Sequence, residues 1–281
     1  MTEFRLTQLS DTHLSEQLPQ LQGNFARVAE HIDRTRPDLV VNTGDVSFDG
    51  VNDPSDLHYA RAMHDQLPVP CRFIPGNHDI GDNPTRTGAP PRHTPTGQSL
   101  RTFVEVLGDD RFSFSAAGWH FIGINALVMN TGLAEEEDQL AWLGSELARI
   151  GDRPLALFTH KPLFRTAPDD IELPETAQRY SPVPARAKLL DLLGTTDLRL
   201  VASGHVHQSH DYTFGHTRHI WAPSTTFVIA SDARQARVGE KKVGLVEYCF
   251  RPEGFEVRFV RAPGQDDIDL HAAVDLTPYG Y

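Results

Sequence analysis

The chain has 281 residues, with 38 acidic and 26 basic side chains and a formal net charge of −12 when its 14 histidines are counted as neutral. Phosphate backbones and anionic membrane surfaces attract cationic proteins, so this charge disfavours long nucleic acids and membranes as partners. Two cysteines are too few for a disulfide framework or a thiolate zinc site. No run approaches the roughly 20 apolar residues that cross a bilayer. The first residues lack the pattern of a signal peptide, so we expect a cytoplasmic protein.

Strand and helix patterns alternate at the start of the chain. Strands are predicted over residues 4–10, 38–43 and 72–74, and amphipathic helices over 24–36 and 54–67. This βαβαβ order is typical of a largely parallel sheet.

The rest of the chain combines further strands and helices with two long loops, at 81–98 and 162–184. The predicted elements are a β-hairpin at 111–115 and 120–126, a helix at 135–150, a strand at 155–158, a helix at 185–193, and strands at 198–202, 218–222, 243–250 and 255–261. Since no repeat or long linker divides the chain, we predict a single domain over 1–264. The polar tail over 265–281 packs either on that domain or on a partner subunit, which leaves a homo-oligomer open.

Residues that can bind metals come directly after five of the predicted strands. In an open α/β sheet the carboxyl ends of the strands share one edge, where ligands bind, so we expect these residues to converge. Carboxylate, amide and imidazole groups without thiolates suit divalent ions such as Mn, Fe, Co or Zn. Seven ligands are too many for one ion and suit two ions that share a carboxylate. The seven are Asp11, His13, Asp45, Asn77, His160, His205 and His207.

Each of these residues taken alone has a simpler explanation. Asp, Asn and Gly are common turn and capping residues at strand ends. Seven such residues, each behind a predicted strand, favour a metal centre. Outside the motifs, we expect the remaining histidines to be incidental, except that His210 lies three residues after His207 and is a candidate substrate contact.

The motifs occur in an order that resembles a known family. Asp11-x-His13, Gly44-Asp45, Gly76-Asn77-His78-Asp79, His160 and Gly204-His205-x-His207 are similar to the motifs of the calcineurin-like metallophosphoesterase superfamily. The resemblance is to its branch of class III cyclic-nucleotide phosphodiesterases and glycerophosphodiesterases, and spans residues 4–224. It implies an α/β fold, a four-layer αββα sandwich of two mixed β-sheets flanked by helices.

The resemblance also implies the metal ligands. Two divalent transition-metal ions per chain are expected, with Asp45 as the bridging carboxylate. One ion would be held by Asp11, His13, Asp45 and His207, and the other by Asp45, Asn77, His160 and His205.

The implied activity is hydrolysis of a small-molecule phosphodiester, either a cyclic nucleotide or a glycerophosphodiester, by a hydroxide that bridges the two ions. His78 matches the family's non-ligand histidine, so we expect it to bind phosphate or protonate the leaving group, or else to support a ligand. Asn77 is a further expected substrate contact. Lys161 stands where many members of the branch have a second histidine, and we expect it at the surface.

Two alternatives stay open. The same metals could serve a phosphomonoesterase or a phosphonate-ester hydrolase, because this scaffold changes substrate through its loops. In another class, the chain could be a non-catalytic binding module of the same fold. A nuclease is disfavoured by the acidic charge.

Overall fold

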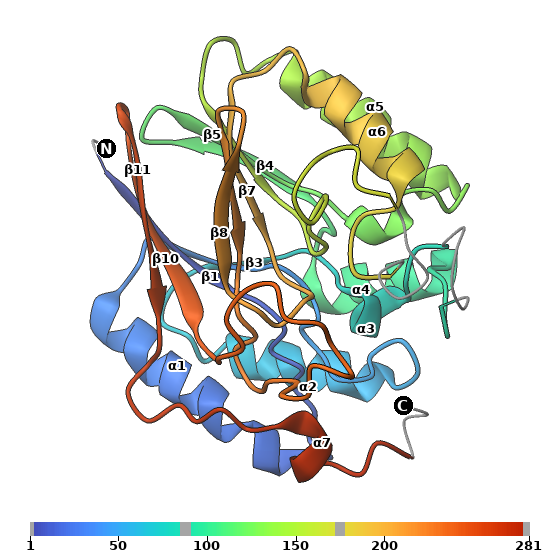
Figure 1. Ribbon diagram of the computed structural model, residues 1–281, viewed down its shortest axis with the longest axis vertical. Helices are drawn as coiled ribbons and strands as arrows, with labels where there is room; N and C mark the ends of the chain where they lie inside the picture. Colours follow the sequence, from blue (N-terminus) through green and yellow to red (C-terminus); the bar gives the residue numbers. More distant parts are fainter. Residues whose placement is uncertain (1–2, 85–90, 172–177, 278–281) are drawn as a thin grey trace.

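The computed structural model describes residues 3–84, 91–171 and 178–277, and its strands form two sheets (Figure 1). The first sheet has the order β11-β10-β1-β2-β3. Its strands are β1 (Phe4–Leu9), β2 (Leu39–Asn42), β3 (Cys71–Phe73), β10 (Leu245–Arg251) and β11 (Gly254–Val260). The strands β1, β2 and β3 run parallel, and β10 and β11 extend the sheet antiparallel, so it is mixed.

The second sheet has the order β4-β5-β6-β7-β9-β8. Its strands are β4 (Phe112–Ala116), β5 (Trp119–Gly123), β6 (Leu155–Phe158), β7 (Leu198–Ser203), β8 (His210–Phe214) and β9 (Thr217–Trp221). The strands β5, β6, β7 and β9 are parallel, with antiparallel β4 and β8 at the two edges.

Helices cover the outer face of each sheet (Figure 1). The first sheet packs against α1 (Gly23–Thr35), α2 (Pro54–His64) and α4 (Gly97–Leu107), and the second against α5 (Ala134–Leu147) and α6 (Val183–Leu193). The shorter helices are η1 (Pro19–Leu21), α3 (Asn77–Ile80), η2 (Ala126–Val128) and α7 (Leu270–Ala273).

Side chains on the central strands alternate between these layers, as extended backbone requires. In β2, Val40 packs with the helices, whereas Leu39 and Val41 pack against the second sheet. In β6, Leu157 faces the helices and Phe158 faces the first sheet. Burial on both faces explains why these strands are continuous apolar runs. The predicted four-layer sandwich of two mixed sheets is confirmed.

The helix α4 was not predicted. It begins at the end of the proline-rich loop predicted over 81–98, so the loop composition obscures the start of the helix in the sequence. Thr96 and Ser99 form a capping box there, and Leu100, Phe103 and Leu107 make its buried face. The helix has only 11 residues, so its apolar spacing is a weaker indication of secondary structure than the proline-rich composition before it.

The C-terminal segment is polar in composition, but it buries apolar side chains. Leu270, Val274 and Leu276 are buried, and they pack with a cluster formed by Leu18, Leu21, Phe48 and Phe227. The described part of the segment, through residue 277, therefore packs on its own chain.

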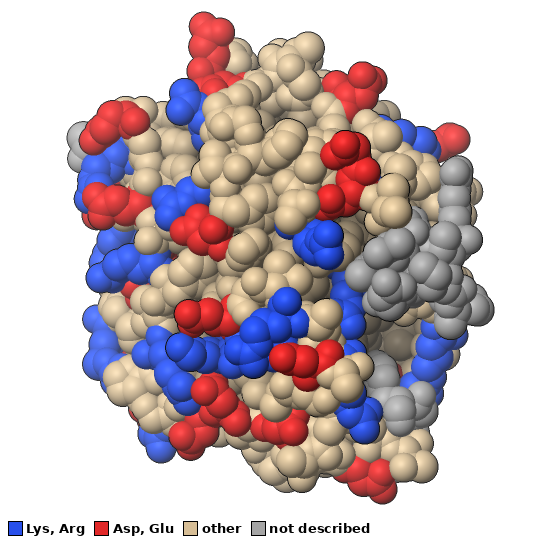
Figure 2. All heavy atoms as spheres, viewed as in Figure 1, with Lys and Arg blue, Asp and Glu red and all other residues tan. Residues whose placement is uncertain are grey.

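Acidic and basic side chains are interspersed on the face drawn in Figure 2. Among the helices in the described ranges, none is long and apolar enough to cross a membrane.

Candidate metal centre

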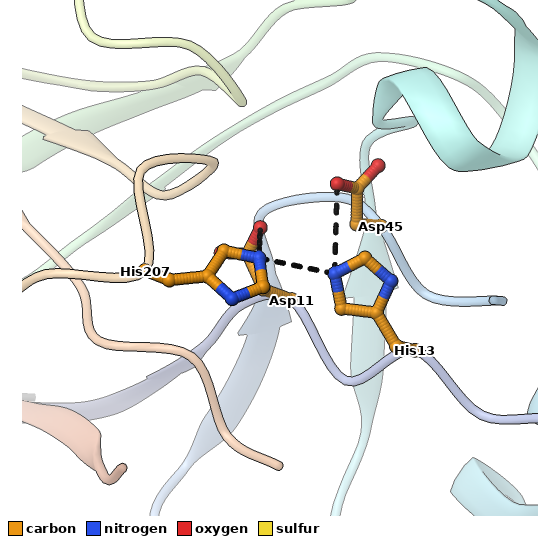
Figure 3. A group of neighbouring side chains, drawn as sticks. All are labelled: Asp11, His13, Asp45 and His207. Atoms are coloured by element: carbon orange, nitrogen blue, oxygen red, sulfur yellow. Dashed lines mark hydrogen bonds and ion pairs between the residues drawn. The ribbon is translucent and has the colours of Figure 1, made fainter. Parts of the chain in front are cut away.

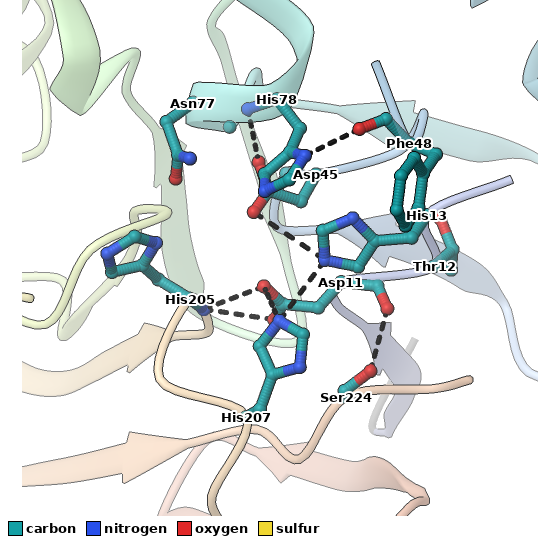
Figure 4. Close-up of polar contacts among 12 residues, drawn as sticks. Asp11, Thr12, His13, Asp45, Phe48, Asn77, His78, His205, His207 and Ser224 are labelled. Carbon is teal, nitrogen blue, oxygen red and sulfur yellow. Dashed lines mark hydrogen bonds and ion pairs between the residues drawn. The ribbon is translucent and has the colours of Figure 1, made fainter. Parts of the chain in front are cut away.

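Residues that follow β1, β2, β3 and β7 meet at one place (Figure 4), and His160, which follows β6, contacts Asn77 and His205 there. Backbone hydrogen bonds join neighbouring loops. The Asp11 N–H donates to the Gly44 carbonyl at 2.9 Å, and the His13 N–H donates to the Asp45 carbonyl at 2.9 Å. In the second sheet, the Gly204 N–H donates to the His160 carbonyl at 2.8 Å. Backbone hydrogen bonds thus join the loop after β1 to the loop after β2, and the loop after β6 to the loop after β7.

Five of the seven candidate ligands have a left-handed backbone. Their φ angles are 53° for Asp11, 42° for His13, 51° for Asp45, 67° for His205 and 49° for His207. This region costs a non-glycine residue on the order of 1–3 kcal/mol and persists where the surroundings enforce it, typically at functional sites. All five of these residues belong to the two groups whose ligand atoms lie within 4.8 Å of one another.

A first cluster joins Asp11, His13, Asp45 and His207 (Figure 3). One ligand atom from each lies within 4.8 Å of the others. The Nε2 atoms of His13 and His207 are 3.1 Å apart. His207 Nε2 lies 3.3 Å from Asp11 Oδ1, and His13 Nε2 lies 3.7 Å from Asp45 Oδ2.

A second cluster joins Asp45 with His160 and His205. His160 Nε2 lies 3.4 Å from Asp45 Oδ2 and 3.1 Å from His205 Nδ1. The side-chain oxygen of Asn77 is 3.2 Å from the same nitrogen. Asp45 belongs to both clusters, so one carboxylate connects them.

The donor set fits a cation because two ring nitrogens of the second cluster face each other. His160 Nδ1 is 2.8 Å from the Thr43 carbonyl, and His205 Nε2 is 2.8 Å from the Gln178 carbonyl. A carbonyl only accepts hydrogen bonds, so these nitrogens carry the ring protons. In the neutral rings the lone pairs therefore lie on His160 Nε2 and His205 Nδ1, the pair 3.1 Å apart. A metal ion satisfies two such lone pairs together.

Burial and neighbouring charges set the protonation of the centre. Burial and the nearby His78 hold the pKa of His13 well below its usual value, and burial and His160 do the same for the pKa of His205. Burial alone would raise the pKa of Asp45, but His160 and His78 hold it well below the usual range. Burial opposes protonation of His160, whereas Asp45 raises its pKa to about 9. A metal at the second cluster must therefore displace a proton from His160.

Asp79 supports the centre without joining a cluster. Its buried carboxylate accepts from the backbone N–H groups of Gly76 at 2.9 Å, Val46 at 3.1 Å and Ser47 at 2.9 Å, and from the Ser47 hydroxyl at 2.6 Å. It thereby joins the loops after β2 and β3. Asp79 was predicted only as part of the strand-end motif, and the signal that marks it is an acid at the third position of a helix, where its carboxylate accepts from the N-cap N–H of Gly76.

His78 lies beside the clusters (Figure 4). Its backbone N–H donates to Asp45 Oδ1 at 2.8 Å, and its ring Nδ1 lies 2.5 Å from the Phe48 carbonyl. The ring lines a cavity of about 390 Å³ that also includes His13, Asp45 and Asn77. His78 therefore lines the cavity beside the clusters without belonging to either of them.

One predicted placement differs from the structure. Lys161 is fully buried and forms an ion pair with Asp82, so its predicted surface position is wrong. His210 lies on β8 with its ring 5.0 Å from that of Tyr212 and is not among the described residues that line the cavity, and its substrate contact stays a prediction. His271, expected to be incidental, does line it, as do Arg179 and Phe227. These residues follow no strand-end motif that could have marked them.

Comparison with known proteins identifies the family. The family described as calcineurin-like phosphoesterase matches residues 4–209. The chain belongs to this family. It is a family of metal-dependent hydrolases, and the relatives below are named as phosphodiesterases.

Two of the similar sequences are bacterial enzymes named as phosphodiesterases. The chain is 25% identical over 269 residues to a probable glycerophosphodiester phosphodiesterase of Arcobacter nitrofigilis, covering 90% of this chain and 88% of the relative. It is 29% identical over 233 residues to a 3′,5′-cyclic adenosine monophosphate phosphodiesterase of Pseudomonas aeruginosa, covering 78% and 75%. These names support the class III phosphodiesterase branch.

Solved structures share the fold. A dimetal phosphatase from Danio rerio is 15% identical, with a TM-score of 0.59 over 92% of this chain and 99% of that chain. A purple acid phosphatase from yellow lupin seeds is 16% identical, with a TM-score of 0.66 over 95% of this chain and 53% of that chain.

Proposed function

We propose that this protein hydrolyses a small-molecule phosphodiester with two divalent metal ions. The observation that carries the proposal is the pair of ligand clusters that share Asp45. The relatives named for cyclic-nucleotide and glycerophosphodiester hydrolysis support a diester substrate.

The residues that would hold the ions are those of the two clusters. Asp11, His13, Asp45 and His207 would hold one ion, and Asp45, Asn77, His160 and His205 would hold the other. Two such ions, when bound, lower the pKa of a water nucleophile and neutralise charge on the phosphate oxygens. Mn, Fe, Co and Zn all suit this set of nitrogen and oxygen ligands.

The chain itself holds these groups in place. Asp11 accepts from the His205 N–H at 2.9 Å, and its own carbonyl accepts from the Ser224 hydroxyl at 2.9 Å. Asp45 is oriented by the His78 N–H. Each carboxylate therefore keeps one fixed direction before substrate enters, which removes an ordering cost from the reaction.

We assign proton delivery to His78. Its Nδ1–H donates to the Phe48 carbonyl, which orients the ring on the lining of the cavity. In the imidazolium form, Nε2–H can donate to the departing alkoxide of the ester. Asn77, one residue earlier, lines the same cavity and is a proposed contact to the phosphate.

The choice between a diester and a monoester is tested by turnover of two chromogenic substrates. With Mn-loaded protein, we expect kcat/KM for bis-p-nitrophenyl phosphate to exceed that for p-nitrophenyl phosphate by at least about tenfold, which corresponds to about 1.4 kcal/mol of transition-state preference. A preference for the monoester would favour the phosphatase alternative, and turnover of neither would favour the non-catalytic one. The cytoplasmic location and a homo-oligomer stay predictions.

A further inference from the structure

Much of the cavity beside the metal centre is apolar. At about 390 Å³ it lies within the size range of small-molecule sites. The wall formed by these apolar side chains is here called the apolar wall. It consists of Phe48, Phe227, Ile229, Leu270 and Leu276.

The apolar wall adjoins the first ligand cluster. The Phe227 ring centroid is 4.8 Å from the ring centroids of both His13 and His207. The Phe48 ring is 5.9 Å from that of His13. A phosphorus atom held at the cluster would therefore place one of its ester groups beside the apolar wall.

Two members of the apolar wall come from the C-terminal segment, which is anchored to the domain. The Leu270 N–H donates to the Val228 carbonyl at 3.0 Å, and the Val228 N–H donates to the Ile268 carbonyl at 2.8 Å. The Asn24 side chain holds the Asp266 carbonyl at 2.8 Å. The wall is thus preorganised, and binding an ester group against it requires little further ordering.

A polar group on the same lining lacks a partner. Gln235 is 7% exposed and lines the cavity, and its side-chain oxygen has no hydrogen-bond partner among the residues that the structure describes. A buried acceptor without a hydrogen bond costs free energy, so a ligand that donates a hydrogen bond to it should bind more tightly.

We propose that the apolar wall and Gln235 select a phosphodiester whose ester group is a ring of aryl or nucleoside size carrying a hydrogen-bond donor. A group of glycerol size would leave the wall in contact with water. This inference rests on the proposed function and extends it to the substrate class. It makes Leu270, Leu276 and Gln235 specificity-determining residues.

The test compares two phosphonates that share a head group and have no ester bond to cleave. For the Mn-loaded wild-type protein, calorimetry is expected to show at least about tenfold tighter binding of phenylphosphonate than of methylphosphonate, because burial of the ring on the wall adds apolar contact. Leu270→Ala and Leu276→Ala should reduce this ratio to about twofold while the Kd of methylphosphonate stays unchanged, which also shows that the variants fold.

Val274→Ala is the matched control. Val274 is buried in the same segment and packs in the same cluster, but it is not among the residues lining the cavity. This variant should keep the wild-type ratio. If Val274→Ala lowered the preference for phenylphosphonate over methylphosphonate as much as Leu270→Ala and Leu276→Ala do, the segment would act only through its effect on stability, and the inference would be wrong.

Gln235→Leu tests the polar part. It keeps the side chain's approximate shape and removes the acceptor, so phenylphosphonate binding should stay unchanged while binding of a nucleoside 5′-phosphonate weakens about tenfold. Equal effects on both ligands would remove Gln235 from the inference.

The outcomes separate the two proposals. Hydrolysis of bis-p-nitrophenyl phosphate by a protein that binds both phosphonates equally would contradict the apolar-wall inference and leave the proposed function intact. Tighter binding of phenylphosphonate without diester hydrolysis would contradict the proposed function and leave the apolar-wall inference intact.

Discussion

His13 and His207, 194 residues apart in the sequence, point their Nε2 atoms at each other across 3.1 Å. They follow β1 and β7, which belong to different sheets. Both rings are buried, and neither Nδ1 has a hydrogen-bond partner within the described part of the chain. Two imidazoles in this arrangement can share at most one proton, whereas a metal ion can bind both. The relationship therefore supports a metal ion at the first cluster.

Replacing the shared carboxylate should remove both metals. Loss of a group that only supports a metal ligand costs about 10–100-fold in affinity, so Asp45→Asn is expected to weaken metal binding by at least about a hundredfold and to abolish diester turnover. Metal content after dialysis measures this. Asp49→Asn is the control, because Asp49 is half-buried and its carboxylate accepts from Asn52 at 2.7 Å. Full metal content in Asp45→Asn would refute the bridging assignment.

Removing the His78 ring should separate rate from metal binding. We expect His78→Ala to keep two ions per chain and to lower kcat by about 10²–10⁴, the usual contribution of general acid catalysis. His58→Ala, an exposed histidine on α2, should change neither. If His78→Ala lost a metal ion, His78 would be a ligand and its proposed role would be wrong.

A methyl group at Gly204 should disrupt the site from the backbone. A Cβ there would overlap the Ser10 hydroxyl and come within 2.6 Å of Asp11 Oδ2. We expect Gly204→Ala to lower the free energy of unfolding by about 1–3 kcal/mol, as overpacking does, and to weaken metal binding. Gly144→Ala in α5 has open space around it and should be neutral or stabilising by about 0.5–1 kcal/mol. Urea denaturation of both variants checks this, and equal stabilities would contradict it.

His64 should make the protein less stable in acid. It lies under the loop after β2, with Nδ1 2.8 Å from the Ala60 carbonyl and Nε2 3.1 Å from the Asn42 amide nitrogen. Nε2 must therefore accept, which a protonated ring cannot do. Burial lowers its pKa to about 4.

The unfolded chain takes up this proton near pH 6.5 and the folded chain only near pH 4, so stability is lost as the pH falls between these values. We expect His64→Gln, which keeps an acceptor, to lose about 3 kcal/mol less free energy of unfolding over this pH interval than the wild-type protein loses. The check is urea denaturation of the metal-free proteins at pH 7 and pH 4. An unchanged difference between the two pH values would exclude His64 as the source.

Strand-end residues were predictable because their signal is local. Asp11, Asp45 and His205 each follow a short apolar run, and parallel strands bring their carboxyl ends to one edge. The sequence could not reveal that Lys161 is buried, because its partner Asp82 lies 79 residues away. Such pairing depends on tertiary contacts that no periodicity records.

The apolar wall was hidden for a similar reason. Leu270 and Leu276 lie among polar residues in the C-terminal segment, and their spacing predicts neither a long helix nor a strand. Their burial depends on Phe48 and Phe227, which come from two distant loops. The helix α4 was missed because its capping box lies inside a loop rich in proline.

The proposed diester hydrolysis requires two ions, held by the two clusters that share Asp45. Titration of metal-free protein with Mn²⁺, following bis-p-nitrophenyl phosphate hydrolysis, tests it most directly. We expect the rate to rise with added metal and to reach its plateau at two equivalents per chain. A plateau at one equivalent, or a rate independent of metal, would contradict the dinuclear mechanism.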